Sequence, residues 1–208
     1  MNKFLALPAQ NTKATKSIDD DKTEHLTRKI FKIEWRNYFP DNDKFFEEYG
    51  FRVGGELEAL AFLKRSQQNA IGNNFFYNSS NEYKSDYYKY VIDHFVFTYR
   101  DEIIGYLSGN VYDWGSYYLR YCLIEKAHRG KNLFEAAAKR VIEILEQHQV
   151  ERIEAHISVN NQKQMIRLCR MGFSVSGTVA TDRWGVLTSL TKFNNNKANE
   201  VFNTQFCL

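Results

Sequence analysis

The sequence has few cysteines and no long apolar run, and both absences narrow the class of protein. Its 208 residues include three cysteines that are scattered along the chain without a CxxC pair: Cys122, Cys169 and Cys207. This usage indicates reduced thiols in a cytoplasmic protein. No stretch approaches the roughly 18 apolar residues of a membrane span. The apolar N-terminus is interrupted by Pro8 and is too short for a signal peptide, so we expect a soluble protein with no membrane partner.

A strong excess of one charge is also missing. Lys and Arg number 28 against 25 Asp and Glu, which leaves a formal net charge of +3. A domain that binds duplex DNA usually has a clustered basic face, and this balance gives no sign of one, so no nucleic-acid partner is predicted. Aromatic residues, by contrast, are plentiful. The 13 Tyr and 16 Phe indicate a strand-rich fold or a pocket lined with rings.

Length and composition predict one folded domain with polar segments at both ends. Residues 1–25 are polar and charged and are expected to form a flexible N-terminal arm. The domain should span 26–193. Residues 194–208 are similar to the arm in composition and are expected to form a C-terminal tail, although their apolar side chains could dock on the domain.

The first half of the chain has a mixed pattern. Residues 31–35 alternate between apolar and polar, which predicts a half-buried strand. Helical spacing of apolar residues predicts two helices, over 43–49 and 56–64. The buried face predicted for the second helix consists of Leu57, Leu60 and Ala61. Residues 66–90 are rich in Asn, Ser and Tyr and fit either a long loop or short helices.

The second half is more regular. Three runs of β-forming residues joined by short turns predict an antiparallel meander over 94–99, 103–112 and 117–124. Apolar residues then recur every three or four positions, which predicts an amphipathic helix over 132–149. A strand, a short helix and a final hairpin are predicted over 152–159, 161–170, 175–181 and 186–192. This order predicts an α/β domain with a mixed sheet.

A basic turn precedes the long helix. The strand over 117–124 leads into Arg129, Gly130 and Lys131, and the helix starts just after them. The first amides of a helix have no partner within it, and the helix dipole favours negative charge there, so such a turn suits an anion. Many strand–helix turns look similar and bind nothing. The turn alone therefore does not identify a ligand.

Several motifs in a fixed order give the chain a family resemblance. The phosphate-binding signature of the GNAT acetyltransferase superfamily, Arg/Gln-x-x-Gly-x-Gly/Ala, is represented here by Arg129-Gly130-Lys131-Asn132-Leu133-Phe134. Asn161, which begins a short helix, and the pair Gly172-Phe173 follow in the order that the family has. Residues 94–192 therefore resemble this superfamily. The resemblance implies a GNAT-like mixed, mostly antiparallel sheet flanked by helices, with two strands splayed apart at the acyl-CoA site.

Two positions depart from the signature. Asn132 and Phe134 stand where the family has Gly and Gly or Ala. Glycine allows the backbone to approach a pyrophosphate closely. Asn132 keeps its N–H and tolerates a left-handed backbone better than most residues, and Phe134 falls on the apolar face of the helix. The phosphate site that the resemblance implies is therefore retained.

The resemblance implies acetyl-CoA, or another acyl-CoA, as co-substrate. Backbone amides of residues 130–134 would hold its pyrophosphate, with Arg129 and Lys131 nearby. The pantetheine arm would lie like an extra strand between the two splayed strands. The main-chain groups implied for this pairing are those of Leu123, Ile124 and Glu125. Asn161 could bind the arm from the other side, or it could cap its own helix.

The resemblance also implies direct attack of an amine on the thioester carbonyl, with a base for the amine and an acid for the leaving thiolate. The position of the family's usual acid, a Tyr, is occupied by Leu168. The candidate replacements are Tyr118, Tyr121, His156, Glu125 and Cys169. Two of them have a plainer alternative: a structural role for His156 and a solvated charge for Glu125. Cys169 follows Met165 at helical spacing and is expected to pack in the core.

Three hypotheses for activity follow. The leading one is acetyl transfer from acetyl-CoA to an amine, on either a small molecule or a protein. The second is the same fold with a longer acyl donor. The third is a degenerate domain that binds CoA or a protein without chemistry, which Asn132, Phe134 and Leu168 favour. A homodimer is left open. Four tyrosines could line an acceptor pocket or simply pack a loop: Tyr83, Tyr87, Tyr88 and Tyr90.

Overall fold

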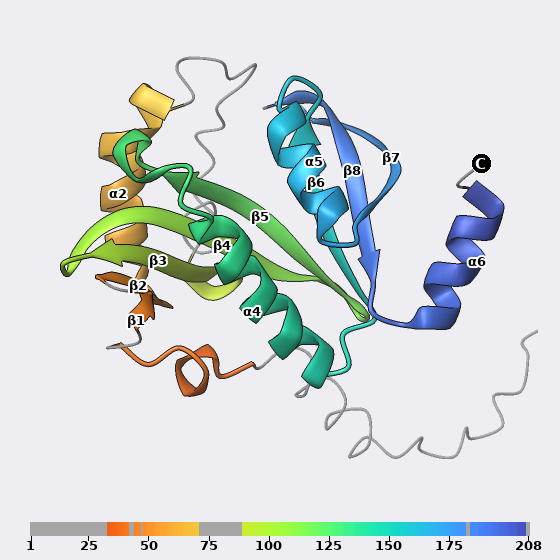
Figure 1. Cartoon of the computed structure of the whole chain (residues 1–208), viewed down its shortest axis with the longest axis horizontal. Coiled ribbons are helices and arrows are strands. Elements are labelled where there is room, and N and C mark those ends of the chain that lie inside the picture. Colours follow the sequence, from red (N-terminus) through yellow and green to blue (C-terminus); the bar gives the residue numbers. More distant parts are fainter. Residues whose placement is uncertain (1–32, 42–43, 47, 71–88, 182–183, 207–208) are drawn as a thin grey trace, which may run out of the picture.

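The fold is an α/β domain built on one mixed sheet. The computed structural model describes residues 33–41, 44–46, 48–70, 89–181 and 184–206. Within them the strands form an eight-stranded sheet in the order β1-β2-β3-β4-β5-β6-β8-β7 (Figure 1). Neighbouring strands are antiparallel, except that β5 and β6 run parallel. The strands are β1 Lys44–Phe46, β2 Tyr49–Val53, β3 Asp93–Tyr99, β4 Glu102–Asp113, β5 Ser116–Ile124, β6 Arg152–Ser158, β7 Ser174–Thr181 and β8 Gly185–Phe193.

Helices cover both faces of the sheet. The helices are η1 Trp35–Asn37, α2 Glu56–Ala70, η2 Lys126–His128, α4 Leu133–Gln147, α5 Gln162–Arg170 and α6 Asn196–Phe206. α4 and α5 share one core cluster on one face, whereas α2 packs with a second cluster on the other face, against β3 and β4 (Figure 1). No helix among the described residues is long and apolar enough to cross a bilayer.

Tight turns produce the meander of β3, β4 and β5. Arg100 and Asp101 both have positive φ, 49° and 67°, as in the hairpin turns that match the twist of antiparallel strands. At the next turn the Gly115 N–H donates to Asp113 Oδ1 over 2.9 Å, so a side chain closes the turn. The antiparallel meander predicted from the sequence is confirmed.

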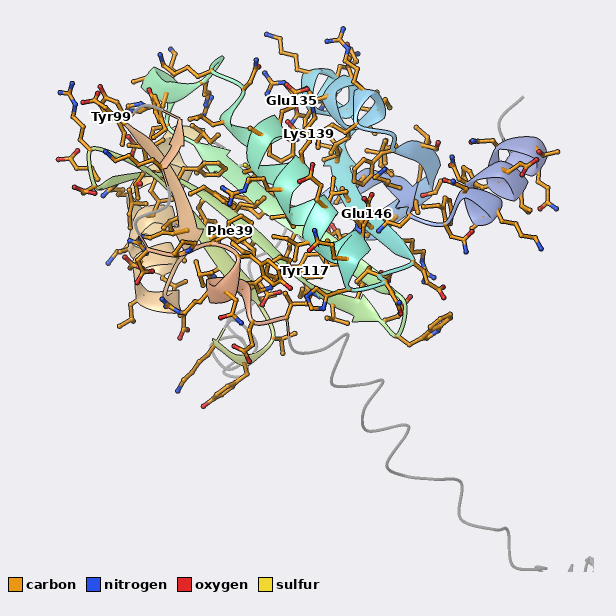
Figure 2. All side chains as sticks on the ribbon, turned by 60° about the horizontal axis from the view of Figure 1, so that its bottom comes forward. Phe39, Tyr99, Tyr117, Glu135, Lys139 and Glu146 are labelled. Carbon is orange, nitrogen blue, oxygen red and sulfur yellow. The ribbon has the colours of Figure 1, made fainter. Side chains whose placement is uncertain are left out.

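α4 buries the apolar face that its period predicts. Its buried side chains are Leu133, Phe134, Ala137, Ala138, Val141, Ile142, Ile144 and Leu145. They join a core cluster that also contains Phe39 and Tyr117. Figure 2 shows Glu135, Lys139 and Glu146 along the same helix, with Phe39 and Tyr117 below it in the view. The long helix is therefore anchored over the centre of the sheet, which fixes the position of the turn before it.

Two predictions for the first part of the domain are wrong. The described residues of 43–49 form strands, first Lys44–Phe46 as β1 and then the start of β2. In place of a strand over 31–35, the described residues lead into the short helix η1. Trp35 is buried there, edge-on to Phe95 with ring centroids 5.1 Å apart. Alternation of apolar residues does not distinguish such core anchors from a strand.

The helix predicted over 56–64 is present as α2, but it is longer and turned differently. It continues to Ala70, and its buried side chains include Ala59 and Phe62. The three residues predicted as its buried face are exposed instead: Leu57, Leu60 and Ala61. Phe62 packs in the cluster on the α2 face of the sheet, and burial of this large ring sets the rotation of the helix.

The C-terminal segment that was predicted as a tail contains a helix. Asn195 Oδ1 accepts the backbone N–H groups of Lys197 and Ala198, which caps the start of α6. Phe202 of α6 packs against Phe193 of β8, with ring centroids 5.2 Å apart. Composition indicated a tail because the segment is polar. The docking that the sequence left open occurs at Phe202, whereas Val201 is exposed.

Candidate active site

β5 and β6 separate along their second halves. They pair in parallel only from Ser116 with Arg152 to Leu119 with Ala155. Beyond that point β5 stays paired with β4 and β6 stays paired with β8, so both strands are held from their other sides. Residues 120–124 therefore diverge from residues 156–158, and we call this opening the β5–β6 split (Figure 1). The splayed strands expected from the sequence are confirmed.

The alternation of hydrogen bonds along β5 determines which main-chain groups face the split. The Glu125 N–H donates to Ile104 O over 2.9 Å, so Glu125 points toward β4. In an antiparallel ladder successive residues point to opposite sides, and Leu123 therefore also points toward β4, whereas Cys122 and Ile124 point into the split. Of the three residues predicted to pair with the pantetheine, only Ile124 has main-chain groups directed into the split.

Cys122 is the residue that sequence reasoning missed at this edge. Main-chain groups alternate in direction along a strand, so the orientation of Cys122 would have been predictable if the sequence had shown which residue of β5 bonds to β4. Ile124 O already accepts a 2.7 Å hydrogen bond from Arg129 Nε. The amide of Ile124 and both main-chain groups of Cys122 are thus the strand positions directed into the split.

The turn between β5 and α4 presents open amides. Gly130 has a φ of +81° and Asn132 a φ of 57°, both in the left-handed region. An added Cβ at Gly130 would meet nothing within 4 Å, so its backbone conformation, and not space, requires glycine. Asn132 adopts the conformation expected of it, and its side chain makes no capping bond. The first amides of α4, from Leu133 on, therefore remain available to an anion.

The basic residues of the turn are held in place by the neighbouring strands. Arg129 is anchored on Ile124 O, and Lys131 Nζ lies 5.9 Å from the centroid of the Tyr49 ring. The Tyr49 hydroxyl and His128 Nδ1 are 3.1 Å apart, which joins the turn to β2. Both cations are exposed, and within the described ranges no carboxylate pairs with either of them. Phe134 is only 7% exposed and packs in the core, so the turn uses its amide and not its ring.

Asn161 caps α5. Its Oδ1 accepts the Gln164 N–H over 3.3 Å, and its own N–H donates to Ser158 O over 2.8 Å. The capping role predicted as one alternative is therefore present. α5 ends at a left-handed Gly172 with φ of +89°, and the Phe173 N–H returns to Leu168 O. These two caps fix a short helix beside the split.

Two of the predicted catalytic candidates lie together. The rings of Tyr118 on β5 and His156 on β6 have centroids 4.7 Å apart, and Tyr112 lies next to both. Their neighbours Leu119 and Ala155 belong to the core on the α4 face, so this pair lies on the opposite face of the sheet. Burial lowers the pKa of His156 below its ordinary value, although the Glu154 carboxylate acts in the opposite direction. A neutral imidazole at neutral pH can accept a proton.

The other two candidates are tied to α2. The Glu125 carboxylate is 3.3 Å from Arg65 Nη2, and the same guanidinium donates to Ile103 O. Tyr121 packs beside the α2 cluster, with its ring centroid 6.1 Å from that of Tyr106. Both residues therefore contact elements that hold α2 to the sheet, and Glu125 is paired with Arg65 rather than being a solvated charge.

The structure places the two described cysteines in different environments. Cys169 is exposed, so its predicted burial is wrong; Leu168, the next residue toward the N-terminus, is the one that packs in the core. Burial raises the pKa of the Cys122 thiol to about 12, and the positive charges of Arg167 and Arg129 act in the opposite direction. At neutral pH this thiol is protonated and weakly nucleophilic. The described part of the chain also holds no cluster of His, Cys, Asp or Glu suited to a metal ion.

The Tyr-rich segment contributes little to the described site. Tyr83, Tyr87 and Tyr88 lie outside the described residues. Tyr90 is exposed. The acceptor pocket predicted for these tyrosines stays a prediction.

The family of the chain follows from its sequence as a whole. The sequence model of the Acetyltransferase (GNAT) family matches residues 28–173, well over half of the chain, and the protein belongs to this family. The match covers the meander, the basic turn, α4 and the Gly-Phe pair that carried the resemblance. No curated protein matches the chain.

Solved structures share the fold at low sequence identity. The ribosomal-protein-S5-alanine acetyltransferase from Vibrio fischeri is 17% identical, with a TM-score of 0.56 over 73% of this chain and 96% of its own. The protein yncA from Salmonella typhimurium, solved with its cofactor acetyl-CoA, is 15% identical, with a TM-score of 0.57 over 72% of this chain and 96% of its own. AAC(6')-Ib, solved with paromomycin and acetyl-CoA, is 18% identical, with a TM-score of 0.54 over 78% of this chain and all of its own (100%).

Proposed function

We propose that the protein transfers an acetyl group from acetyl-CoA to an amine by direct attack of the amine on the thioester. The β5–β6 split is the observation that carries this proposal. It leaves a strand edge unpaired in the middle of a sheet, beside a turn with open amides and two cations that pair with no carboxylate of the described residues. A long anionic ligand with amide groups in its arm would satisfy both features at once.

The groups that would hold acetyl-CoA are distributed along the split. The amides that follow Asn132 and the cations of Arg129 and Lys131 would hold the pyrophosphate. The amides of the pantetheine arm would pair with the main chain of Ile124 and Cys122, which points into the split. Two of the solved relatives contain acetyl-CoA, which supports this choice of donor.

His156 is the residue we assign to the proton of the amine. The amine nitrogen attacks the carbonyl carbon, a C–N bond forms, the C–S bond breaks and the sulfur leaves with the electron pair. The nitrogen loses one proton, which neutral His156 accepts directly or through a water molecule. Tyr118 packs against the imidazole and fixes its orientation. Leu168, at the position of the family's usual acid, is 1% exposed and has no proton to give.

The acceptor belongs to a broad class. The solved relatives include an acetyltransferase of a ribosomal protein and one solved with paromomycin, so protein amines and small-molecule amines both remain candidates. We place the protein in the cytoplasm in this proposal because Cys122 and Cys169 are free thiols. No residue that the structure describes favours a longer acyl chain over acetyl.

Release of free CoA thiol in the presence of amines tests this function. The protein is incubated with acetyl-CoA and a panel of polyamines, aminoglycosides and peptides with free N-termini. Transfer to at least one acceptor, confirmed by a mass increase of that acceptor, is the expected result. Transfer only from longer acyl-CoAs would replace the donor. A rise in melting temperature with CoA but no transfer to any amine would indicate a binding domain without chemistry.

A further inference from the structure

A third ring lies beside the residue assigned as the base. The ring centroid of Tyr112, near the end of β4, is 5.5 Å from that of Tyr118 and 6.3 Å from that of His156. Both distances are within the range of interacting aromatic pairs, and the planes of Tyr112 and His156 stand at 89° to each other. Sequence reasoning did not select Tyr112, because a tyrosine in a strand normally indicates ordinary packing. Its contacts make it part of one aromatic cluster with the base.

The strand register places this aromatic cluster at the closed end of the β5–β6 split. Tyr118 is opposite Glu154, one position before the last β5–β6 pair, Leu119 with Ala155. His156 is the first residue of β6 beyond that pair. An acyl-CoA with its pyrophosphate at the turn after β5 would extend its arm along the split, so its thioester end would reach the closed end. The aromatic cluster therefore lies where an acceptor amine would meet the thioester.

Tyr112 provides the exposed part of the cluster. It is 52% exposed, whereas Tyr118 and His156 are half-buried. A flat apolar group of a ligand that covers the Tyr112 ring would remove apolar surface of both from water. Two rings gain further free energy when they stack with an offset or meet edge to face. The cluster thus offers a ligand ring a surface directly beside the imidazole.

The charges beside the cluster balance one another. Arg152 Nε donates to Glu154 Oε1 over 3.1 Å, and Arg152 Nη2 donates to Asp113. The Arg120 guanidinium carbon lies 6.0 Å from the centroid of the Tyr118 ring. Two carboxylates are therefore accompanied by two guanidinium groups, and one cation already lies near an aromatic face. This balance favours a neutral flat group over a second cation on the acceptor.

We propose that Tyr112 determines specificity by binding an aromatic ring that the acceptor carries close to its amine, as in a 2-arylethylamine. The inference rests on the proposed function. The acceptor ring would pack against Tyr112, while the amine, two carbon atoms away, reaches His156. The 6.3 Å between the two ring centroids suits such a short linker. Because Tyr112 would touch the acceptor away from the reacting atoms, its removal should change KM more than kcat.

Steady-state kinetics with two matched amines test this role. At saturating acetyl-CoA, the wild-type KM for 2-phenylethylamine should be about three- to tenfold lower than that for butylamine, the scale of one aromatic pair. Tyr112→Leu should remove this difference by raising KM for 2-phenylethylamine, with kcat changed less than about twofold. Tyr112→Phe, which keeps the ring, is the matched control and should retain the wild-type preference. Thermal melting of both variants checks the fold.

Butylamine separates ring binding from a structural role. If Tyr112 only supported the fold or the base, Tyr112→Leu would impair transfer to both amines equally, and that result would overturn the inference. Equal KM values for the two amines in the wild type, or a preference that survives in Tyr112→Leu, would also overturn it. So would transfer to other amines but to neither of these two, or a Tyr112-dependent preference for 1,4-diaminobutane, which would indicate a cation site. Absence of transfer to any amine would instead refute the proposed function, so the two failures are distinguishable.

Discussion

The Tyr117 hydroxyl donates a 2.7 Å hydrogen bond to Asp93 Oδ2 and so joins β5 to β3 across the intervening strand β4. Tyr117 is fully buried, and burial raises the pKa of both groups. The ring passes over Gly109 of β4, where an added Cβ would come within 2.3 Å of ring atom Cε1. Because Gly109 has no side chain, the Tyr117 ring has room to cross β4 and join β5 to β3.

Gly109→Ala should destabilise the protein by about 1–3 kcal/mol, because the new methyl group overpacks against a ring that cannot move. Chemical denaturation measures the loss. Gly115→Ala is the control, since its Cβ would first meet the flexible end of Glu151 at 3.2 Å. Equal stability of the two variants would show that Tyr117 has room to shift.

Glu58 should stabilise the protein above about pH 4.5. Its carboxylate accepts two hydrogen bonds from Arg52 and one from the Gly55 N–H at the start of α2, which lower its pKa from 4.5 to about 2. A lowered pKa in the folded state adds stability above the unfolded value, and this stability is lost as the pH falls from about 4.5 toward 2.

Glu58→Gln should therefore cost about 1 kcal/mol of unfolding free energy at pH 7, a figure reduced because the Glu58 side chain is 39% exposed. The difference from wild type should disappear near pH 2. Denaturation of both proteins across this pH range is the measurement. Glu56→Gln, on the same helix turn, is the control and should keep the wild-type free energy of unfolding at pH 7, because Glu56 forms no ion pair with a described residue.

Lys131→Ala should weaken CoA binding by about 1–2 kcal/mol, the range of a charge-assisted contact to phosphate. Isothermal titration with CoA measures the change. Lys139→Ala, a matched exposed lysine on α4, should bind like wild type. A pantetheine thioester without the pyrophosphate should bind both variants equally. A similar loss for that short donor would assign Lys131 a role in the fold, through its contact with Tyr49.

The acetyl-transfer rate should fall at low pH as His156 takes up a proton. The base must be neutral, and burial lowers the pKa of His156, so the fall should begin below its ordinary value of 6.5. The pH dependence of kcat/KM is the measurement. His156→Gln should lose activity and also this acidic limb. Retention of the limb in the variant would assign the titration to another group, such as the amine acceptor.

The sequence predicted most of the second half of the fold and less of the first. α4 was predicted because Leu133, Phe134, Ala137 and Val141 recur at helical spacing over a long stretch. β1 was missed because three residues carry no measurable period, and the ladder that defines it comes from pairing with β2. Pairing is a tertiary property, and the local pattern does not contain it.

The candidate site was also predicted only in part. The phosphate turn was predicted from Arg129 to Phe134 because its residues are consecutive. Cys122 was missed, since it matters through the direction in which its main-chain groups point, and that direction depends on which strand edge is already bonded. The rotation of α5 that buries Leu168 is likewise set by tertiary packing. Cys169 was misplaced for the same reason.

The short parallel pairing between β5 and β6 affects how the two parts of the sheet can move. Among the described residues, strand pairing joins β1 to β5 with β6, β8 and β7 only through the pairs from Ser116–Arg152 to Leu119–Ala155. A ligand in the split would contact strands on both sides of it. Once the ligand dissociates, β6, β7 and β8 would be able to twist more freely relative to β1 to β5. Amide hydrogen exchange in β6 and β8 would then report occupancy of the split more sensitively than exchange in β3 and β4.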